Sequence, residues 1–188
     1  MPPKVKVTRE EIVAAALGIV REHGADAINA RSIAQALGCS TQPIFSNFST
    51  MDEVRLAVAR EAVALYRECM RREVERGEYP YYKASGMAYI RFAREERELF
   101  KLLFMCDREK GASLDTSALF GEMQAVVQGN LGLDRGEAEL FHLEMWAFVH
   151  GIAAMQATAF LDLDRELVSR MLTDAYQGMM KRHGKGEA

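Results

Sequence analysis

Residues 33–48 constrain the fold of this chain more than any other stretch, because they contain two short helical patterns joined by three residues. The first half is apolar and rich in alanine, a glycine follows at residue 38, and the second half begins Ser-Thr-Gln-Pro. Gly38 permits a tight turn, since glycine adopts a left-handed backbone conformation without the steric cost of a Cβ atom. The stretch therefore predicts two small helices that cross at a steep angle.

This helix pair has an apolar side and a polar side. The apolar positions that would hold the two helices together are Ile33, Ala34, Leu37, Ile44 and Phe48. Small polar side chains remain for the other face of the second helix, namely Ser40, Thr41, Gln42, Ser46 and Asn47. Such a face suits the DNA major groove, where amides and hydroxyls pair with base edges. An ordinary helical hairpin inside a bundle explains the same stretch, so the surrounding sequence has to decide between these two interpretations.

The rest of the chain predicts an all-α protein of about nine helices. About half of the residues are apolar and only four prolines interrupt them. Thr8-Arg9-Glu10-Glu11 is a capping box that opens a helix ending at His23-Gly24, and Asn29 caps the next helix. Residues 49–53 cap a long helix over 52–76. Further helices are predicted over residues 81–94, 97–105, 114–129, 137–161 and 164–182.

This order of helices predicts two domains. A three-helix head occupies residues 1–50, and a long helix joins it to a larger helical body, residues 51–188. The helix over 137–161 is apolar on nearly every side, so two of its faces must be covered. One face would line the domain core and the other would meet a partner chain, together with the apolar stripe of residues 164–182.

Composition excludes several classes of protein. The net charge is −3 and residues 1–48 carry five Lys and Arg against four Asp and Glu, so the whole molecule is not a basic nucleic-acid binder. The cysteines at 39, 69 and 106 are a poor disulfide framework, which favours a reducing, cytoplasmic compartment. The uncharged and largely apolar stretch 145–161 is shorter than the roughly 20 apolar residues of a membrane span. We expect a soluble protein that does not enter a membrane.

The residues of the helix pair, with those that follow them, carry a family resemblance over residues 8–60. The pattern is Ile33-Ala34-x-x-Leu37-Gly38-Cys39-Ser40-x-x-x-Ile44-Phe45-x-x-Phe48-x-x-Met51-x-x-Val54. It is similar to the helix-turn-helix of TetR/AcrR-family transcriptional regulators, which has IA, three residues, GVS, an aromatic doublet, then a lysine and a leucine. In the body, Trp146-x-x-x-His150-Gly151 resembles the WHG motif of one C-terminal subgroup.

The resemblance implies a homodimer whose two heads enter successive major grooves of a partly palindromic double-stranded DNA operator. It also implies a body that binds a small-molecule effector, and dimerisation through the last two helices. Thr41, Gln42 and Pro43 would begin the recognition helix, where Gln42 can pair with adenine. Arg31 and the short basic arm of residues 1–7 would bind phosphates, although a solvated surface charge also explains Arg31. The DNA-binding residues predicted in this way are Lys4, Lys6, Arg31, Ser40, Thr41, Gln42, Pro43, Phe45, Ser46 and Asn47.

Three positions depart from the family pattern. Phe45 stands where tyrosine is usual, Asn47 where histidine or tyrosine is common, and Met51 where lysine is usual. The tyrosine hydroxyl and the lysine ammonium would each contact a phosphate, so their loss should weaken DNA binding and flatten its salt dependence. The helix N-termini at Asn29 and Ser49 could compensate in part by offering backbone amides.

The body is crowded with aromatic and methionine side chains, which are either a plain core or the lining of an apolar ligand pocket. Few charges fall on these faces, so the expected ligand is hydrophobic or aromatic. His150 is either its polar anchor or a hydrogen-bonded core histidine. Metal ligands with suitable spacing and catalytic motifs are absent from the sequence, so we expect no cofactor, no metal and no enzyme. The predicted pocket residues are Tyr66, Cys69, Tyr89, Phe92, Phe100, Phe104, Met123, Trp146 and His150.

Two functional hypotheses follow. The first is a ligand-responsive dimeric repressor that a small hydrophobic or aromatic molecule releases from its operator. The second is a helical small-molecule-binding protein or enzyme that retains the head only as a scaffold, and the departures at Phe45 and Met51 give it some weight.

Overall fold

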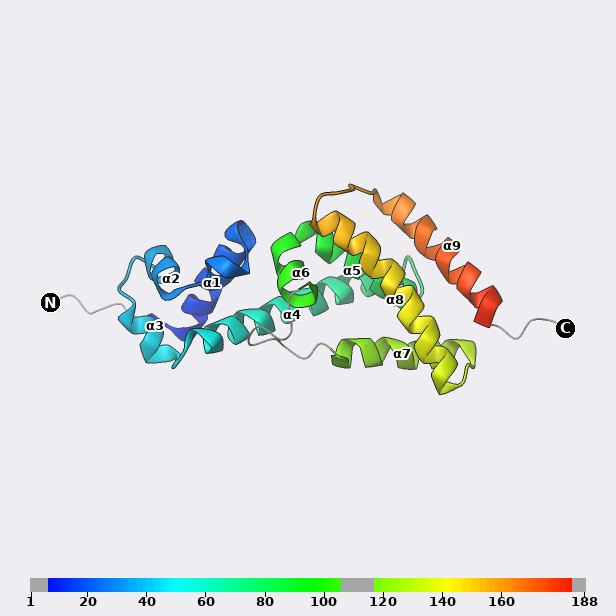
Figure 1. Cartoon of the computed structure of the whole chain (residues 1–188), viewed down its shortest axis with the longest axis horizontal. Helices are drawn as coiled ribbons and strands as arrows, with labels where there is room; N and C mark the ends of the chain where they lie inside the picture. Colours follow the sequence, from blue (N-terminus) through cyan, green and yellow to red (C-terminus); the bar gives the residue numbers. More distant parts are fainter. Residues whose placement is uncertain (1–6, 106–116, 184–188) are drawn as a thin grey trace. The chain divides into compact units, whose positions relative to one another are not determined.

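The computed structural model describes residues 7–105 and 117–183, and the side chains of residues 117–122 are not described. Within these ranges the chain is helical and contains no strand, which confirms the predicted all-α class (Figure 1). A short 3₁₀ turn, Ala25–Ala27, follows the first helix. The nine α-helices in the described part are α1 (Arg9–His23), α2 (Ala30–Ala36), α3 (Gln42–Asn47), α4 (Met51–Glu75), α5 (Tyr81–Glu95), α6 (Arg97–Phe104), α7 (Ser117–Leu131), α8 (Arg135–Ala157) and α9 (Arg165–His183).

The predicted caps form at the first two helices. Thr8 Oγ1 accepts from the Glu11 amide at 3.1 Å, and Glu11 Oε2 accepts from the Thr8 amide at 2.8 Å, which closes the capping box of α1. Asn29 Oδ1 accepts from the amides of Arg31 and Ser32, both at 3.0 Å. These bonds satisfy backbone donors that the first turn of a helix leaves without an intrahelical partner. Local sequence alone therefore fixes where these two helices begin.

The long helix α4 also begins at a cap. Thr50 Oγ1 accepts from the Glu53 amide at 3.2 Å, and Glu53 Oε2 accepts from the Ser49 amide at 2.9 Å. The helix ends before Gly77, whose φ of +65° is a left-handed conformation that favours glycine. The observed range Met51–Glu75 differs by one residue at each end from the prediction.

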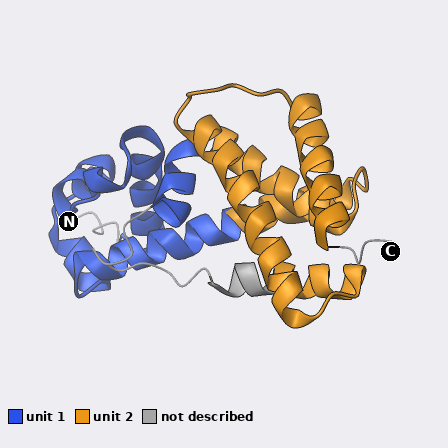
Figure 2. Cartoon of the chain, turned by 45° about the vertical axis from the view of Figure 1, so that its right-hand side comes forward, with its two compact units in different colours: residues 1–65, 96–114 blue, residues 66–95, 115–188 orange. Residues whose placement is uncertain are grey.

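The chain divides into two compact units (Figure 2). Unit 1 contains α1, α2, α3, the first part of α4 and α6, and unit 2 contains the end of α4 with α5, α7, α8 and α9. Helix α4 therefore supplies residues to both units. The boundary that the sequence predicts after residue 50 separates a DNA-binding head from a ligand-binding body, and it stays a prediction.

Unit 1 is built around α1, which contacts α2, α3 and α6. Burying one large aliphatic or aromatic side chain contributes roughly 1.5–3 kcal/mol, so the apolar core between these helices is the main stabilising feature of the unit. Its apolar core consists of Ile12, Ala16, Val20, Ile28, Ile33, Ile44, Phe48, Val54, Val58, Leu99 and Phe100.

Unit 2 is built around the packing of α5 on α8, with α7 and α9 against the same pair. Its core is apolar and partly aromatic, and it also buries polar groups that are described below. The larger core side chains are Met87, Tyr89, Phe92, Phe141, Met145, Ile152, Val168 and Leu172.

Helix α8 is shorter than predicted at its C-terminal end. The expected helix ran to residue 161, whereas α8 ends at Ala157. The Thr158 hydroxyl bonds back to the Ala154 carbonyl at 2.8 Å, and Ala159 takes a positive φ of 55° that ends the helix. Apolar periodicity alone did not reveal this stop.

None of the described helices is both long and apolar enough to span a membrane.

Candidate nucleic-acid interface and candidate ligand site

The turn between α2 and α3 forms as the sequence predicts. Gly38 has a φ of +62°, where any other residue would strain the backbone. The amides of Gly38 and Cys39 donate to the carbonyls of Gln35 at 3.2 Å and Ala34 at 3.0 Å, which ends α2. Helix α3 then starts with Pro43 in its first turn, where proline needs no amide partner.

The two faces of this helix pair are separated as expected. Ile33, Ala34, Ile44 and Phe48 are buried, and Leu37 is half-buried. On the other face Ser40, Gln42, Phe45 and Ser46 are exposed, and Thr41, Pro43 and Asn47 are half-buried. The structure thus brings the predicted base-facing residues onto one short surface.

Two of these polar side chains already have partners inside the protein. Asn47 Nδ2 donates to the carbonyls of Val7 at 3.2 Å and Pro43 at 2.8 Å, and the Ser46 hydroxyl donates to the Gln42 carbonyl at 2.9 Å. Asn47 therefore anchors the segment that precedes α1 onto α3. Sequence reasoning placed Asn47 on the base-facing side and did not foresee this structural role.

Arg9 fixes α1 against α3 in a way that the sequence did not suggest. Its guanidinium donates to the Asn47 carbonyl at 2.7 Å and lies 3.8 Å from the centre of the Phe48 ring. This arrangement combines a charge-assisted hydrogen bond with a cation–π contact. Such a distant pairing depends on the turn geometry, which sequence spacing does not specify.

The predicted phosphate-binding groups are only partly described. Arg31 is exposed in the first turn of α2, whereas Lys4 and Lys6 lie outside the described residues. The proposed use of helix-terminal amides needs correction at Asn29, because the Asn29 side chain accepts the amides of Arg31 and Ser32. The Ser49 amide likewise donates to Glu53.

In unit 2, five of the predicted pocket residues lie together. The Tyr66 ring makes edge-on contacts with Tyr89 and Phe92, at centroid distances of 5.9 and 5.5 Å. The Tyr89 hydroxyl is 3.0 Å from His150 Nδ1, and Trp146 stacks on His150 at 5.0 Å. Cys69 Sγ lies 3.7 Å from the Ala88 carbonyl at one side of this group. We call Tyr66, Tyr89, Phe92, Trp146 and His150 the aromatic cluster.

The other predicted pocket residues are elsewhere. Phe100 and Phe104 belong to unit 1, where their rings contact each other at 5.2 Å, and Met123 is half-buried on α7. Sequence periodicity marked these side chains as apolar and helical. It did not indicate which unit each helix joins.

Two tyrosine–histidine pairs connect α5 and α8. Tyr82 bonds His142 Nδ1 at 2.9 Å, and Tyr89 bonds His150 Nδ1 at 3.0 Å. Each helix advances by about two turns between its two pair members, so α5 and α8 run in the same direction. Burial lowers the pKa of His142 to about 4, and burial also lowers the pKa of His150. Both imidazoles are therefore neutral acceptors or donors at neutral pH.

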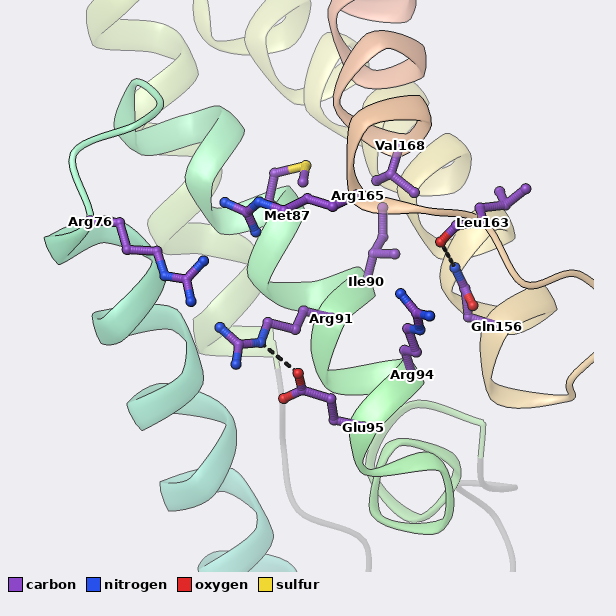
Figure 3. A pocket seen from close by; sticks show the side chains of 10 residues that line it. All are labelled: Arg76, Met87, Ile90, Arg91, Arg94, Glu95, Gln156, Leu163, Arg165 and Val168. Atoms are coloured by element: carbon purple, nitrogen blue, oxygen red, sulfur yellow. Dashed lines mark hydrogen bonds and ion pairs between the residues drawn. The ribbon is translucent and has the colours of Figure 1, made fainter.

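A separate pocket in unit 2 has a volume of about 270 Å³ (Figure 3). Its walls come from the end of α4, from α5, from the α8–α9 connection and from the start of α9, and they include none of the predicted pocket residues. The sequence prediction that few charges fall on the faces with aromatic and methionine side chains concerned other residues and did not foresee this pocket. Four arginines line it, namely Arg76, Arg91, Arg94 and Arg165.

This architecture is similar to that of known transcriptional regulators. Residues 82–176 match the family model described as Tetracyclin repressor-like, C-terminal domain. A TetR-like transcriptional regulator from Rhodococcus sp. RHA1 has a TM-score of 0.72 and 13% identity, covering 98% of this chain and 100% of that chain. A TetR from Streptomyces coelicolor has a TM-score of 0.64 and 15% identity, covering 92% and 97%. None of the curated proteins matches the chain.

A third similar structure contains a ligand. It is a TetR variant from Acinetobacter baumannii AYE in complex with minocycline, with a TM-score of 0.60 and 16% identity, covering 96% of this chain and 100% of that chain. At such identities these structures establish similarity of fold alone.

Proposed function

Because this chain belongs to the TetR family of transcriptional regulators, we propose that it is a homodimeric repressor. In this proposal the dimer binds a partly palindromic double-stranded operator, and a small hydrophobic or aromatic ligand releases it. The observation that carries the proposal is the exposed polar face of α3, supported from behind by Ile44 and Phe48, which are buried.

Base reading is assigned to the start of α3. Gln42 is exposed at the first position of the helix, with Thr41 beside it. A glutamine amide can bond adenine N6 and N7 together, and a threonine can contact a thymine methyl or a base edge. Ser40, Pro43 and Ser46 lie on the same short surface and would complete the base-facing set.

Phosphate contacts position this surface without reading sequence. Arg31 supplies one exposed guanidinium, and Lys4 and Lys6 would supply others. Phe45 is 52% exposed and can contact DNA only through apolar surface, because it lacks the hydroxyl of tyrosine. Asn47 already holds the segment before α1, so its contribution would be indirect. We therefore expect modest affinity with a shallow salt dependence.

The aromatic cluster is the proposed effector site. It presents flat rings from three helices and a polar anchor at His150, whose neutral imidazole bonds Tyr89. This combination suits an aromatic ligand with one polar group. A protein of similar fold binds minocycline, a polycyclic ligand, which agrees with this choice of chemistry.

The proposed dimer interface uses α8 and α9. Leu140 and Leu143 are exposed three residues apart on α8, and Leu167 is exposed on α9. Apolar side chains repeated along one helix face favour association with a second copy of that face. A pair of helices from each chain would then form a four-helix interface.

Coupling between ligand and DNA requires that the ligand prefer one conformation over another. The chain offers a covalent route, since α4 supplies both units and α6 of unit 1 follows α5 of unit 2 directly. Within unit 1, α6 is tied to α1 by Arg21, whose Nε and Nη2 lie 2.9 and 2.6 Å from the Glu96 carboxylate. A shift of α6 would therefore act on α1, which packs against α3.

The test is a fluorescence titration of the full chain with the DNA upstream of its own gene, at several salt concentrations. Gln42→Ala should reduce the free energy of DNA binding by about 1–3 kcal/mol and relax the sequence preference at one base pair. Arg31→Ala should weaken binding to all DNA sequences alike and reduce the slope of its salt dependence by about 1. Gln35→Ala, an exposed glutamine on α2, is the matched control and should change neither quantity. Absence of binding at low salt would contradict the proposal and favour a binding protein that keeps the head as a scaffold.

A further inference from the structure

The arginine-lined pocket of unit 2 has a chemistry that the aromatic cluster lacks. Figure 3 shows Arg76, which directly follows α4, extending toward α5, and Arg91 extending from α5 toward Arg76. Arg165 reaches in from the start of α9, and Arg94 lies on α5 near Gln156. Three of these guanidinium groups, those of Arg76, Arg91 and Arg165, therefore lie on one side of α5, and that of Arg94 lies on the other side, toward Gln156.

One buried carboxylate lies behind this group. Glu73 is completely buried, and its Oε1 accepts from Arg165 Nη2 at 2.5 Å. Its Oε2 makes no hydrogen bond and lies 3.7 Å from Arg91 Nη1 and 3.9 Å from Arg76 Nη1. A single buried negative charge is thus shared by three arginines, whereas Arg94 has no contact with it among the ion pairs described.

The other carboxylates near the pocket are exposed to solvent. Glu78 bonds Arg165, Glu95 bonds Arg91, and Asp162 lies 3.1 Å from Arg94, with side-chain exposures of 47%, 54% and 72%. Ion pairs with such exposed carboxylates are weak, because water screens them and can replace either partner. The most exposed of them is Asp162, so an anion entering the pocket can replace it at Arg94 at little cost.

The remaining wall is apolar. Met87, Ile90, Leu163 and Val168 line it, and Gln156 donates to the Leu163 carbonyl at 2.9 Å, which holds the α8–α9 connection in place. The volume of about 270 Å³ is slightly below the roughly 300–1,000 Å³ of pockets for drug-sized ligands. The occupant should be small and partly apolar.

We propose that this pocket is a binding site for a small molecule that carries an oxyanion on an apolar body. The oxyanion, a carboxylate or a phosphate, would bond the guanidinium group of Arg94, whose planar donors match two oxygen atoms at once. The apolar body would lie against Met87, Ile90 and Val168. This site is separate from the proposed effector site, and the inference does not depend on DNA binding.

The test compares two probes of equal chain length, octanoate and octan-1-ol, by isothermal titration calorimetry with the full chain. Octanoate should bind saturably with one site per chain and more tightly than octan-1-ol by about tenfold, the size expected when hydrogen bonds to a charged group are lost. Equal affinity for the two probes, or no octanoate binding at millimolar concentration, would overturn the proposal.

The location is tested by methionine methyl NMR of the same protein. Octanoate should shift the methyl signal of Met87, identified with a Met87→Leu variant, and leave Met51 of α4 in unit 1 unchanged. Saturable binding that moves other methionines and not Met87 would place the ligand elsewhere and overturn the assignment.

Arg94→Gln is the informative substitution, because Arg94 pairs only with the exposed Asp162 among the ion pairs described and its loss should not disturb Glu73. It should weaken octanoate about tenfold and leave octan-1-ol unchanged. Arg170→Gln, an exposed arginine on α9 outside the pocket, is the matched control and should have no effect. Equal octanoate affinity in Arg94→Gln and the unmodified chain would contradict the proposal. Titration with octyl phosphate in place of octanoate distinguishes the two oxyanions, because the probe with the higher affinity carries the headgroup that the pocket prefers.

Discussion

The two units differ in what they bury. Among the described residues, the buried polar and charged side chains are Glu73, Ser85, His142 and Gln156, and all four belong to unit 2. The buried side chains described in unit 1 are apolar. A polar group buried without a partner costs free energy, so unit 2 maintains these groups only through specific hydrogen bonds and ion pairs.

This difference follows from how each unit presents its polar chemistry. In unit 1 the hydrogen-bonding side chains cap helices or face outward, as at Thr8, Asn29 and Gln42. In unit 2 they point inward, as in the pairs Tyr82–His142 and Tyr89–His150. An outward polar face suits a large polar partner such as DNA, whereas inward polar groups suit recognition of a small molecule enclosed by the protein.

The largest change in the free energy of unfolding is expected when a large side chain is removed from the apolar core of unit 1. Phe48→Ala should destabilise the chain by about 3–5 kcal/mol, because Phe48 is 2% exposed and its removal leaves a cavity beneath Arg9. Urea unfolding followed by circular dichroism measures this change. Phe45→Ala, three residues earlier and exposed, is the control and should change stability by less than about 0.5 kcal/mol. Similar losses for both would show that α3 is not packed as described.

The next effect is expected where the buried charge of unit 2 is removed. Glu73→Gln should cost about 3 kcal/mol, because it leaves three arginines without the buried carboxylate that they share. This value is the low end of the range for broken buried pairs, since those guanidinium groups are partly exposed and can be hydrated. Glu75→Gln on the same helix removes only an exposed ion pair with Arg71 and should leave the unfolding midpoint unchanged. If both variants unfolded alike, Glu73 would not be an internal charge.

The smallest effect concerns pH and the histidines of unit 2. His142 has a pKa of about 4 in the folded chain against an ordinary value near 6.5, so its unfolded form takes up the proton first. Stability should therefore fall by about 1 kcal/mol as the pH drops from 7.5 to 5.5, as long as His142 is present. His142→Gln should remove this loss in thermal unfolding measured over that pH range.

His183 changes the stability with pH in the opposite direction. Its two ring nitrogens lie 2.9 Å from Glu144 and 2.8 Å from Glu137, and these carboxylates raise its pKa. The stability that it contributes is present below pH 6.5 and is lost as the pH rises through its folded pKa. His183→Gln should therefore steepen the loss toward acid, whereas His142→Gln should flatten it. The same slope in both variants would contradict these assignments.

Much of unit 1 could be predicted because its determinants are local. The capping boxes, the positive φ of Gly38 and the apolar spacing of Ile33, Ile44 and Phe48 each act within a few residues. The residues that we propose to face the bases were predicted from the same pattern. Asn47 was the exception, because its partner Val7 is distant in sequence and the bond forms only when α1 meets α3.

For unit 2 the sequence by itself determined that the chain is helical, where most helices begin and end, and which side chains are apolar. It did not determine that Arg165 meets Glu73, 92 residues away, nor that α5 and α8 pair two tyrosines with two histidines. Helix periodicity gives the face on which a side chain lies but not the helix it will contact, so arginines that look solvated in sequence became the wall of a pocket. Tertiary packing alone decided which charges lie inside, because the free energy of a buried charge depends on partners that the local sequence does not supply.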